Sequence, residues 1–463
     1  MRSSWLFRLA VCGVVGLGLA ASGLAVHRDL DFILWASHFV ADGHLNVYQA
    51  VYEGPHQAAL QGLTYPPLTY LYFGTLIWVG KLLGLFAYAE WNTPMVLKGR
   101  DYFFIRVSYV PYWLLIAWTC RRFAERFIFP DSPERESMGR LVFLVGLTSP
   151  VLLFVAFVFG QFDLLPSSML FLGVYLISTR RLFLGVLAVF VGVWLKNFPI
   201  LFLGVAAPVL VVEYGWKRTA AALAMGVGLT SLWMRAFRSP GFSNSYLKFQ
   251  HQQYDVLVWV GQDGLRATMG VYLLLAVVFL AVGLVLFRNR LVTWERLVLL
   301  YSWAFIVLLA PRFWMPQYMS WVAPAFVLFL VLWLRLESPV VPGFYLALNG
   351  LYLLSTAVIF PHNVDVNMFH KLHRAGMPGL AEFLRLDGLR NEVWTSMSML
   401  LYLVVALIAV RMFFWERVKK ALEPTVVWSP LRQLQWTSAL SVVAFMAFIG
   451  LHLVNIWVAR GRL

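Results

Sequence analysis

Two aspartates near the start of the chain have the spacing and the setting of groups that carry out chemistry. Asp29 and Asp31 lie one residue apart, directly after an apolar run that ends near residue 26. Charge at a membrane edge is costly, so acidic residues placed there usually have a polar task. A carboxylate in that position can take a proton from a hydroxyl group as a general base. The competing interpretation is a pair of solvated loop acids, in company with Asp42 and Glu53.

The composition places the chain among integral membrane proteins. Of its 463 residues, 61% are hydrophobic and 13% are charged, whereas soluble domains have about 25% charged residues. The net charge of +15 comes from short basic groups between apolar runs, the distribution that orients helices in a bilayer, and nucleic acid is therefore excluded as a partner. Cys12 and Cys120 both lie in apolar runs, which excludes a disulfide framework or a zinc site.

The apolar runs predict an all-α polytopic membrane protein with about 13 transmembrane helices. Run 5–26 is longer than the core of a signal peptide and is expected to remain as the first helix. Further runs lie near 102–120, 141–159, 163–178, 182–196, 199–213, 219–235, 269–287, 296–310, 319–334, 341–360, 394–414 and 434–458. We expect one integral domain, 1–463, with 1–235 as its catalytic module and 236–463 as more variable helices.

The topology depends on whether residues 65–89, a further apolar run, cross the membrane. If they do not cross and the N-terminus is cytoplasmic, the basic clusters all fall inside, as the positive-inside rule requires. These clusters are Arg121/Arg122/Arg126/Arg135/Arg140, Arg180/Arg181, Lys217/Arg218, Arg288/Arg290/Arg296 and Arg411/Arg417/Lys419/Lys420. Residues 65–89 then form an interfacial or re-entrant helix in the first outer loop, which agrees with their Pro-Pro start and many aromatic residues.

Several polar residues fall on the same outer side. Gly160-Gln161-Phe162-Asp163 joins two runs, and its plain interpretation is a tight turn in which Asp163 caps the next helix. Lys196 lies at the end of a run, where it is either a snorkelling lysine or a point charge for a phosphate. Arg312 is a competing phosphate ligand because its planar fork suits phosphate oxygens. Gln317 and Tyr318 follow Arg312 on the same turn. The alternative role for these three residues and for Lys196 is that of interfacial anchors.

Taken in order, these motifs resemble those of the GT-C superfamily of glycosyltransferases. The motifs are Asp29-Leu30-Asp31-Phe32, Gly43, Tyr65-Pro66-Pro67-Leu68, Gly160-Gln161-Phe162-Asp163, Lys196-Asn197-Phe198-Pro199 and Pro316-Gln317-Tyr318. The chain is most similar to the polyprenyl-phosphate-mannose-dependent mannosyltransferases of bacteria. The first mannosyltransferase of GPI-anchor synthesis and the dolichyl-phosphate-glucose glucosyltransferases share parts of the pattern. Each motif is short, so the specificity comes from their shared order over the first two-thirds of the chain.

The resemblance implies an inverting glycosyltransferase with its active site outside the cytoplasm, in a bacterial cell (inner) membrane. The relatives' catalytic aspartate precedes an aromatic or apolar residue and lies four positions before another aromatic. Asp31, followed by Phe32 and Trp35, matches this pattern; Asp29, with Ile33 four positions on, does not. Asp31 is thus the expected base, and Asp29 a neighbouring contact or a ligand of the acceptor hydroxyl.

The other roles follow from the same resemblance. The donor is expected to be a polyprenyl-phosphate hexose, with mannose preferred, and the acceptor a glycolipid or glycan. The expected substrate-binding residues are Gln161, Asp163, Lys196, Arg312, Gln317, Tyr318, Tyr65 and His38. A monophosphate leaving group needs less charge neutralisation than a diphosphate, so no metal ion or other cofactor is expected to be obligatory. The protein is expected to be a monomer among membrane lipids.

A transporter or flippase of lipid-linked sugars is the alternative from another class. Such proteins often have inverted repeats and broken helices near the midplane. The interrupted pair 182–213 favours this alternative, whereas the absence of an internal repeat and the gathering of polar residues on one side favour the enzyme. His27 and His38 flank the expected base, where a histidine can bind sugar or tune the charge of the base. The competing interpretation, preferred for these two as for His362, His370 and His373, is that of ordinary loop histidines.

Overall fold

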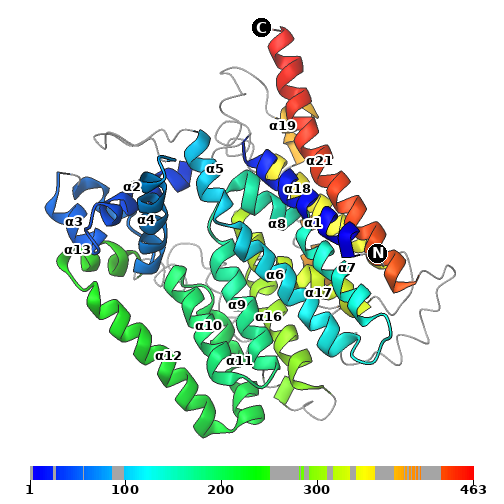
Figure 1. Cartoon of the computed structure of the whole chain (residues 1–463), viewed down its shortest axis with the longest axis horizontal. Coiled ribbons are helices and arrows are strands. Elements are labelled where there is room, and N and C mark those ends of the chain that lie inside the picture. The colour runs from blue at the N-terminus through cyan, green and yellow to red at the C-terminus, as the bar shows by residue number, and fades with distance from the viewer. Residues whose placement is uncertain are drawn as a thin grey trace. The chain divides into compact units, whose positions relative to one another are not determined.

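A computed structural model describes most of the chain. The described residues are 4–23, 28–55, 57–85, 99–250, 291–309, 316–333, 340–359, 380–389 and 429–462, with isolated residues between 281 and 285 and between 392 and 407. Within these ranges every regular element is a helix, which confirms the predicted all-α class (Figure 1). The predicted module boundary at residue 235 stays a prediction.

The chain divides into two compact units, each built from separate segments. Unit 1 contains Met1–His27, Arg106–Phe171 and Tyr301–Leu463, and unit 2 contains Arg28–Ile105 and Leu172–Leu300. Three helices have residues in both units: α5 (Gly99–Val107), α9 (Leu164–Ser178) and α16 (Thr293–Leu309).

Unit 1 is held together by aromatic packing between helices. Its remaining described helices are α1 (Ser4–Ser22), α6 (Val110–Phe123), η2 (Ala124–Ile128), α7 (Arg135–Leu147), α8 (Pro150–Leu153), η3 (Phe154–Phe159), η5 (Pro316–Trp321), α17 (Ala323–Trp333), α18 (Val340–Ile359), α19 (Leu380–Phe383), η8 (Asp387–Leu389) and α21 (Pro430–Arg462). Phe154 packs edge-on against Tyr352 at 5.8 Å and Phe448 at 5.6 Å between ring centroids. Segments η2 and η3 are π-helical, a form that is rare and is often found at functional sites.

Unit 2 contains most of the first predicted outer loop, between runs 5–26 and 102–120, and the described residues of this loop are mainly helical. The elements of the unit are α2 (Arg28–Ala41), α3 (Val47–Glu53), η1 (Gln57–Gly62), α4 (Pro67–Leu82), α10 (Leu182–Leu195), α11 (Ile200–Tyr214), α12 (Trp216–Ala236), α13 (Pro240–Phe242) and the π-helical η4 (Ser243–Leu247). Helices α2 and α4 pack closely because Gly74 leaves room for Val40 and for the backbone of Ser37. As predicted, the run 182–213 is interrupted, since α10 and α11 are separated by residues 196–199.

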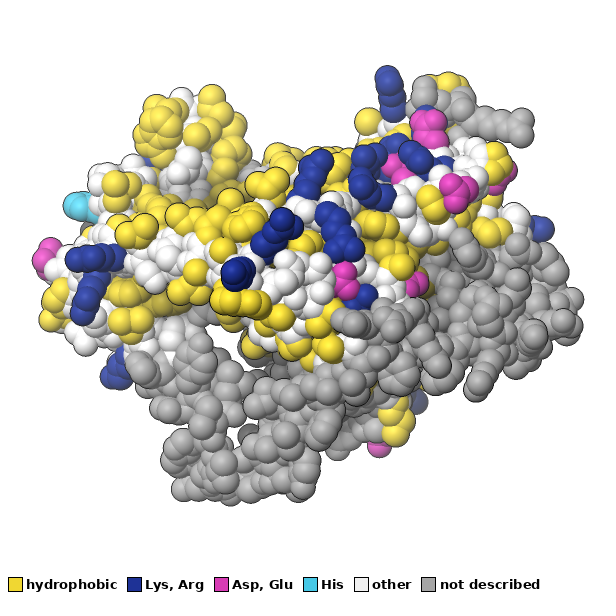
Figure 2. All heavy atoms as spheres, turned by 90° about the horizontal axis from the view of Figure 1, so that it is seen from below, with side chains coloured by type: hydrophobic (Ala, Val, Ile, Leu, Met, Phe, Trp, Pro, Cys, Tyr) yellow, Lys and Arg dark blue, Asp and Glu magenta, His cyan; other side chains and the backbone are white. Residues whose placement is uncertain are grey.

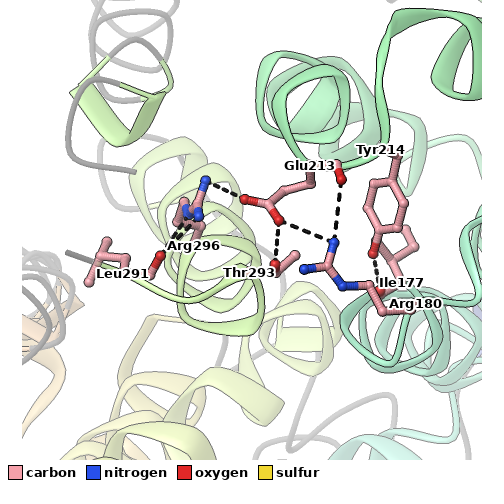
Figure 3. A network of polar contacts seen from close by, with 7 residues as sticks. All are labelled: Ile177, Arg180, Glu213, Tyr214, Leu291, Thr293 and Arg296. Carbon is pink, nitrogen blue, oxygen red and sulfur yellow. Dashed lines mark hydrogen bonds and ion pairs between the residues drawn. The ribbon is translucent and has the colours of Figure 1, made fainter. Parts of the chain in front are cut away.

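A largely buried ion-pair network ties α11 to the first turn of α16 (Figure 3). Glu213 accepts from Thr293 Oγ1 at 2.6 Å and pairs with Arg296 at 2.5 Å. Arg296 also donates to the Leu291 carbonyl oxygen at 2.9 Å. The exposed Arg180 reaches Glu213 at 3.3 Å, which adds the end of α9. A buried carboxylate needs such partners because an unpaired buried charge costs several kcal/mol.

Several helices are long and apolar enough to cross a membrane. Four qualify by length and composition among the described residues, Trp5–Ser22, Asp101–Ile128, Val340–Ile359 and Pro430–Asn455, and the number rises to six if two bent helix pairs each count as one span. Large apolar side chains lie exposed on these helices, including Trp457 at 77% and Trp5 at 62%. Lysine and arginine side chains gather beside apolar areas on the face in Figure 2. These features are compatible with an integral membrane protein.

The first prediction concerns residues 65–89, of which α4 is 16 residues long and therefore shorter than the ~20 residues of a typical crossing. We expect Lys98→Cys to react with an impermeant thiol reagent applied from outside intact cells, in a chain with Cys12 and Cys120 replaced by alanine. Arg181→Cys, in a predicted cytoplasmic turn, should react only after permeabilisation. Labelling of position 98 only after permeabilisation would mean that residues 65–89 cross the membrane.

Candidate active site

Asp31 lies in the first turn of α2, where the helix dipole favours a negative charge. Its side chain is partly exposed. Leu30, Ile33 and Leu34 on the same helix are fully buried and hold the helix in place. Asp29 belongs to the same first turn, but its side chain lies outside the described part of the structure. The chain therefore presents the candidate base from a rigid helix end instead of an irregular loop.

Tyr102 donates its hydroxyl hydrogen to Oδ1 of Asp31. Tyr102 belongs to α5 and is 1% exposed. The two residues are far apart in sequence, and the sequence analysis missed this contact because Tyr102 stands in an apolar run with Phe103 and Phe104. An aromatic residue in such a run is usually a packing residue, and the polar end of a tyrosine was the only available signal.

The aromatic neighbours of Asp31 pack against the segment that leads into α4. The ring of Phe32 lies against Gly62, so closely that a Cβ atom at residue 62 would overlap the ring. Phe32 also contacts Trp35 at 5.3 Å between ring centroids. Gly62 ends η1, three residues before Tyr65. This packing joins the candidate base to the Tyr65-Pro66-Pro67-Leu68 motif.

Lys196 and Tyr65, two predicted substrate-binding residues, lie together. Lys196 follows the last residue of α10 in an extended conformation, and its ammonium nitrogen lies 5.4 Å from the centroid of the Tyr65 ring. The backbone of Tyr65 is held by the buried Tyr48, whose hydroxyl donates to the Tyr65 carbonyl oxygen at 2.5 Å. A cation over an aromatic face gains about 0.5–2 kcal/mol, depending on its solvation. The pair combines a positive charge with an aromatic surface.

Asn197 connects this pair to η4 and to the residues that follow it. The Asn197 amide donates to Gln250 at 2.6 Å and accepts from the Tyr246 hydroxyl at 2.9 Å. Gln250 in turn donates to the Thr64 carbonyl oxygen at 3.5 Å. These side chains therefore link the break between α10 and α11 with the residue before Tyr65. Gln250 and Tyr246 were missed because neither lies near the motifs in sequence.

His38 takes part in a separate network between α2 and α4. Its Nδ1 contacts Asp42 at 2.6 Å and its Nε2 contacts the Lys81 ammonium at 2.7 Å, while Lys81 also donates to Asp42 at 2.9 Å. Burial and the Lys81 charge lower the pKa of His38 to about 3, against the opposing effect of Asp42. The ring is therefore neutral at physiological pH. Its Nδ1 contacts Asp42, directly after the same helix, and its Nε2 contacts Lys81 of α4, which joins the two helices. Its role in binding a substrate stays a prediction.

In unit 1, a buried arginine supports the turn at residues 160–163. Gly160 has a φ of +70°, a left-handed conformation that favours glycine. Arg106 lies against Gly160 in the space that a Cβ atom would need. The fully buried guanidinium donates to the carbonyl oxygens of Ser22 at 2.6 Å and Val158 at 3.1 Å. Arg106 thereby joins the end of α1 to the end of η3, a role that the sequence analysis missed.

The structure brings Asp163 together with the predicted residues of η5. Asp163 is fully buried directly before α9, and its carboxylate accepts from Trp321 Nε1 at 2.7 Å. Tyr318 packs on Trp321 with ring centroids 4.5 Å apart. Gln317 is buried, and among the described residues its side-chain oxygen has no hydrogen-bond partner. A buried amide oxygen of this kind is expected to find a partner in a ligand or a water molecule.

The predicted residues thus form groups within each unit. Unit 2 has Asp31 with Tyr102, and Lys196 with Tyr65. Unit 1 has the buried Gln161 and Asp163 of one turn, and Asp163 is hydrogen-bonded to Trp321 of η5, the element that also contains Gln317 and Tyr318. Arg312 lies outside the described residues. Within the described ranges, no three His, Cys, Asp or Glu side chains come together as a metal site would require. The expectation that no metal is obligatory stays a prediction.

No protein-family model, curated protein or solved structure matches the chain. The class of the protein must therefore be argued from the residues and their geometry.

The contact between Phe32 and Gly62 gives the second prediction. Gly62→Ala should lower the thermal unfolding midpoint in detergent, because the added methyl group overlaps the Phe32 ring and overpacking costs about 1–3 kcal/mol. Gly204→Ala is the matched control, since a Cβ atom at that position of α11 meets nothing within 4 Å. Equal midpoints for the two variants would contradict the close packing of α2 on η1.

Proposed function

We propose that the protein is an inverting hexosyltransferase that uses a polyprenyl-phosphate sugar, with mannose as the preferred sugar, and acts outside the cytoplasm. The observation that carries the proposal is the setting of Asp31, which lies in the first turn of α2 with its carboxylate bonded to the buried Tyr102 hydroxyl. A carboxylate with these supports suits the general base of a glycosyl transfer, and the order of motifs supports the same class.

The chemistry needs one base and one leaving group. Asp31 takes the proton of the acceptor hydroxyl as that oxygen attacks the anomeric carbon of the sugar. The new glycosidic bond forms while the bond from the anomeric carbon to the phosphate oxygen breaks, and the configuration at that carbon inverts. Polyprenyl phosphate leaves as an anion and needs no protonation. One carboxylate is therefore enough, in contrast to the two carboxyl groups of glycoside hydrolysis.

Lys196 is the proposed cation for the donor phosphate. It is partly exposed, lies over the Tyr65 ring, and is adjacent to the Asn197 network that positions this stretch of backbone. An ammonium group binds phosphate oxygens as a point charge, and the hydrogen bonds it makes with them are charge-assisted. Arg312 is the proposed second cation.

The proposed topology is that of a GT-C glycosyltransferase in a bacterial inner membrane. It has about 13 crossings, and residues 65–89 lie at the outer interface. The basic clusters, among them Arg121/Arg122 and Lys217/Arg218, support this orientation because they fall in cytoplasmic segments. The product would be a glycolipid, made by a monomer at the outer surface of the membrane.

A flippase of lipid-linked sugars is the second candidate function. The break between α10 and α11, with a lysine at its start, favours it because transporters use broken helices for substrate binding. Purified protein can be incubated in detergent with polyprenyl-phosphate-mannose and a membrane lipid extract, and the lipids then examined by mass spectrometry. A lipid that gains a hexose supports the transferase, since a flippase makes no new glycosidic bond.

The third prediction tests the base. Asp31→Asn should lower the rate of hexose transfer by ~10²–10⁴-fold, because an amide keeps the shape of the carboxylate but cannot accept the proton. Donor binding and the unfolding midpoint should change little. Asp29→Asn provides the matched comparison on the same helix turn.

Two outcomes would change the assignment. If Asp29→Asn loses activity while Asp31→Asn keeps it, the roles of the two aspartates are reversed. If both variants transfer hexose at the normal rate, neither aspartate is the base and the proposed site is wrong.

The fourth prediction concerns the donor phosphate. Lys196→Ala should weaken apparent donor affinity about ten- to hundredfold, because a hydrogen bond to a charged group contributes ~1.5–3 kcal/mol. The apparent affinity for the acceptor should change much less. Lys217→Ala is the control, since Lys217 also lies near an aromatic ring, that of Trp216 at 5.8 Å, but in a predicted cytoplasmic turn. Unchanged donor saturation in Lys196→Ala would make Lys196 an interfacial anchor and assign the phosphate to other cations, such as Arg235, Arg238 or Lys248.

A further inference from the structure

We infer that Tyr102 is a positioning residue that orients the Asp31 carboxylate for proton transfer. The inference rests on the proposed function of Asp31 and adds a residue to which no role has been assigned. Its basis is the hydrogen bond from the Tyr102 hydroxyl to Oδ1 of Asp31, made by a side chain that is 1% exposed.

The placement of Tyr102 makes this bond well defined. In α5, Tyr102 and Ile105 are buried, whereas Phe103 is 41% exposed. The helix therefore turns Tyr102 inward within unit 2. A buried phenol has two rotatable bonds and a hydroxyl that needs a partner, so burial of the ring fixes where the donor points. The donor then fixes the plane of the carboxylate.

The same bond affects the charge on Asp31. A hydrogen bond donated to a carboxylate favours the ionised form over the protonated one. The Asp31 side chain is only partly exposed, on a helix where Leu30, Ile33 and Leu34 are buried, and partial burial of a carboxylate favours its protonated form. The hydrogen bond from Tyr102 opposes this effect, because it is made to the ionised carboxylate.

This arrangement has the logic of known catalytic groups in which a third residue orients the base. The reacting hydroxyl is held by the base, and the base is held by a group that does not touch the substrate. In this protein, the acceptor hydroxyl, Asp31 and Tyr102 fill those positions. A purely structural tyrosine would instead stabilise α5 without affecting the titration of the base.

The fifth prediction is the test. In the full-length protein in detergent, Tyr102→Phe should lower kcat about ten- to hundredfold and leave the KM for the donor nearly unchanged. The acidic limb of the kcat/KM profile should move to higher pH, because the carboxylate loses a bond that favours its ionised form. In an Asp31→Asn background, Tyr102→Phe should have no further effect on the rate, since interacting residues are not additive.

Matched variants separate positioning from stability. Tyr214→Phe removes a hydroxyl that donates to the Ile177 carbonyl oxygen, and it should leave the acidic limb in place. Replacement of Tyr102 by 3-fluorotyrosine keeps the size of the ring and strengthens the donor, so the limb should move to lower pH. This second variant keeps the test valid if Tyr102→Phe fails to fold.

The outcomes distinguish this inference from the proposed function. If the wild-type protein transfers no hexose, the proposed function fails and the inference fails with it. If the wild type is active and Asp31→Asn is inactive, but both Tyr102 variants keep the wild-type rate and acidic limb, the proposed function stands and the inference is wrong. A fall in rate that only matches the loss of stability, with no shift in the acidic limb of the kcat/KM profile, also overturns the inference about Tyr102.

Discussion

Burial of charge among apolar side chains is the constraint on which the polar architecture of this protein depends. A buried charge must find an opposite charge or several hydrogen bonds, because its desolvation is expensive. Glu213 meets this requirement with Arg296 and Thr293, and Arg106 meets it in part with the carbonyl oxygens of Ser22 and Val158. In each case, the partner comes from a different helix or helix end. The contacts that solve the desolvation problem therefore also join the helices within a unit.

Asp31 in the first turn of α2 and Asp42 directly after its last residue have different partners. Asp42, at the end of the helix, is paired with Lys81 and His38, and this group joins α2 to α4. Asp31, at the start, is bonded to the neutral Tyr102. A neutral donor holds a carboxylate in place and still leaves it a net negative charge, whereas an ion pair neutralises that charge. The hydrogen bond from a neutral donor to Asp31 agrees with its proposed role as the proton acceptor.

The helical class, the break at residues 196–199 and the helix start after Asp163 could all be predicted from the sequence, because each depends on local apolar runs and turn residues. The contact of Lys196 with Tyr65 joins two predicted residues, although no local pattern predicts it. Tyr102 and Arg106 could not be found in this way, because their partners are distant in sequence. A tyrosine or an arginine inside an apolar run has the same appearance whether it anchors a helix or holds an aspartate. The predicted count of about 13 crossings comes from summing many short runs, whereas four to six helices among the described residues are long and apolar enough to cross.

The π-helical segment η3 ends directly before Gly160, and it sets the direction of the turn that follows. A π-helical turn accommodates one residue more than an α-helical turn, and each residue of a helix corresponds to a rotation of about 100°. Loss of a single residue within Phe154–Phe159 would therefore return this turn to the α-helical form, and the turn that follows, with the hydrogen bond from Trp321 to the Asp163 carboxylate, would keep its direction. Deletion of one residue is thus expected to be better tolerated in this segment than in the α-helical parts of the chain, where it would rotate everything that follows by about 100°.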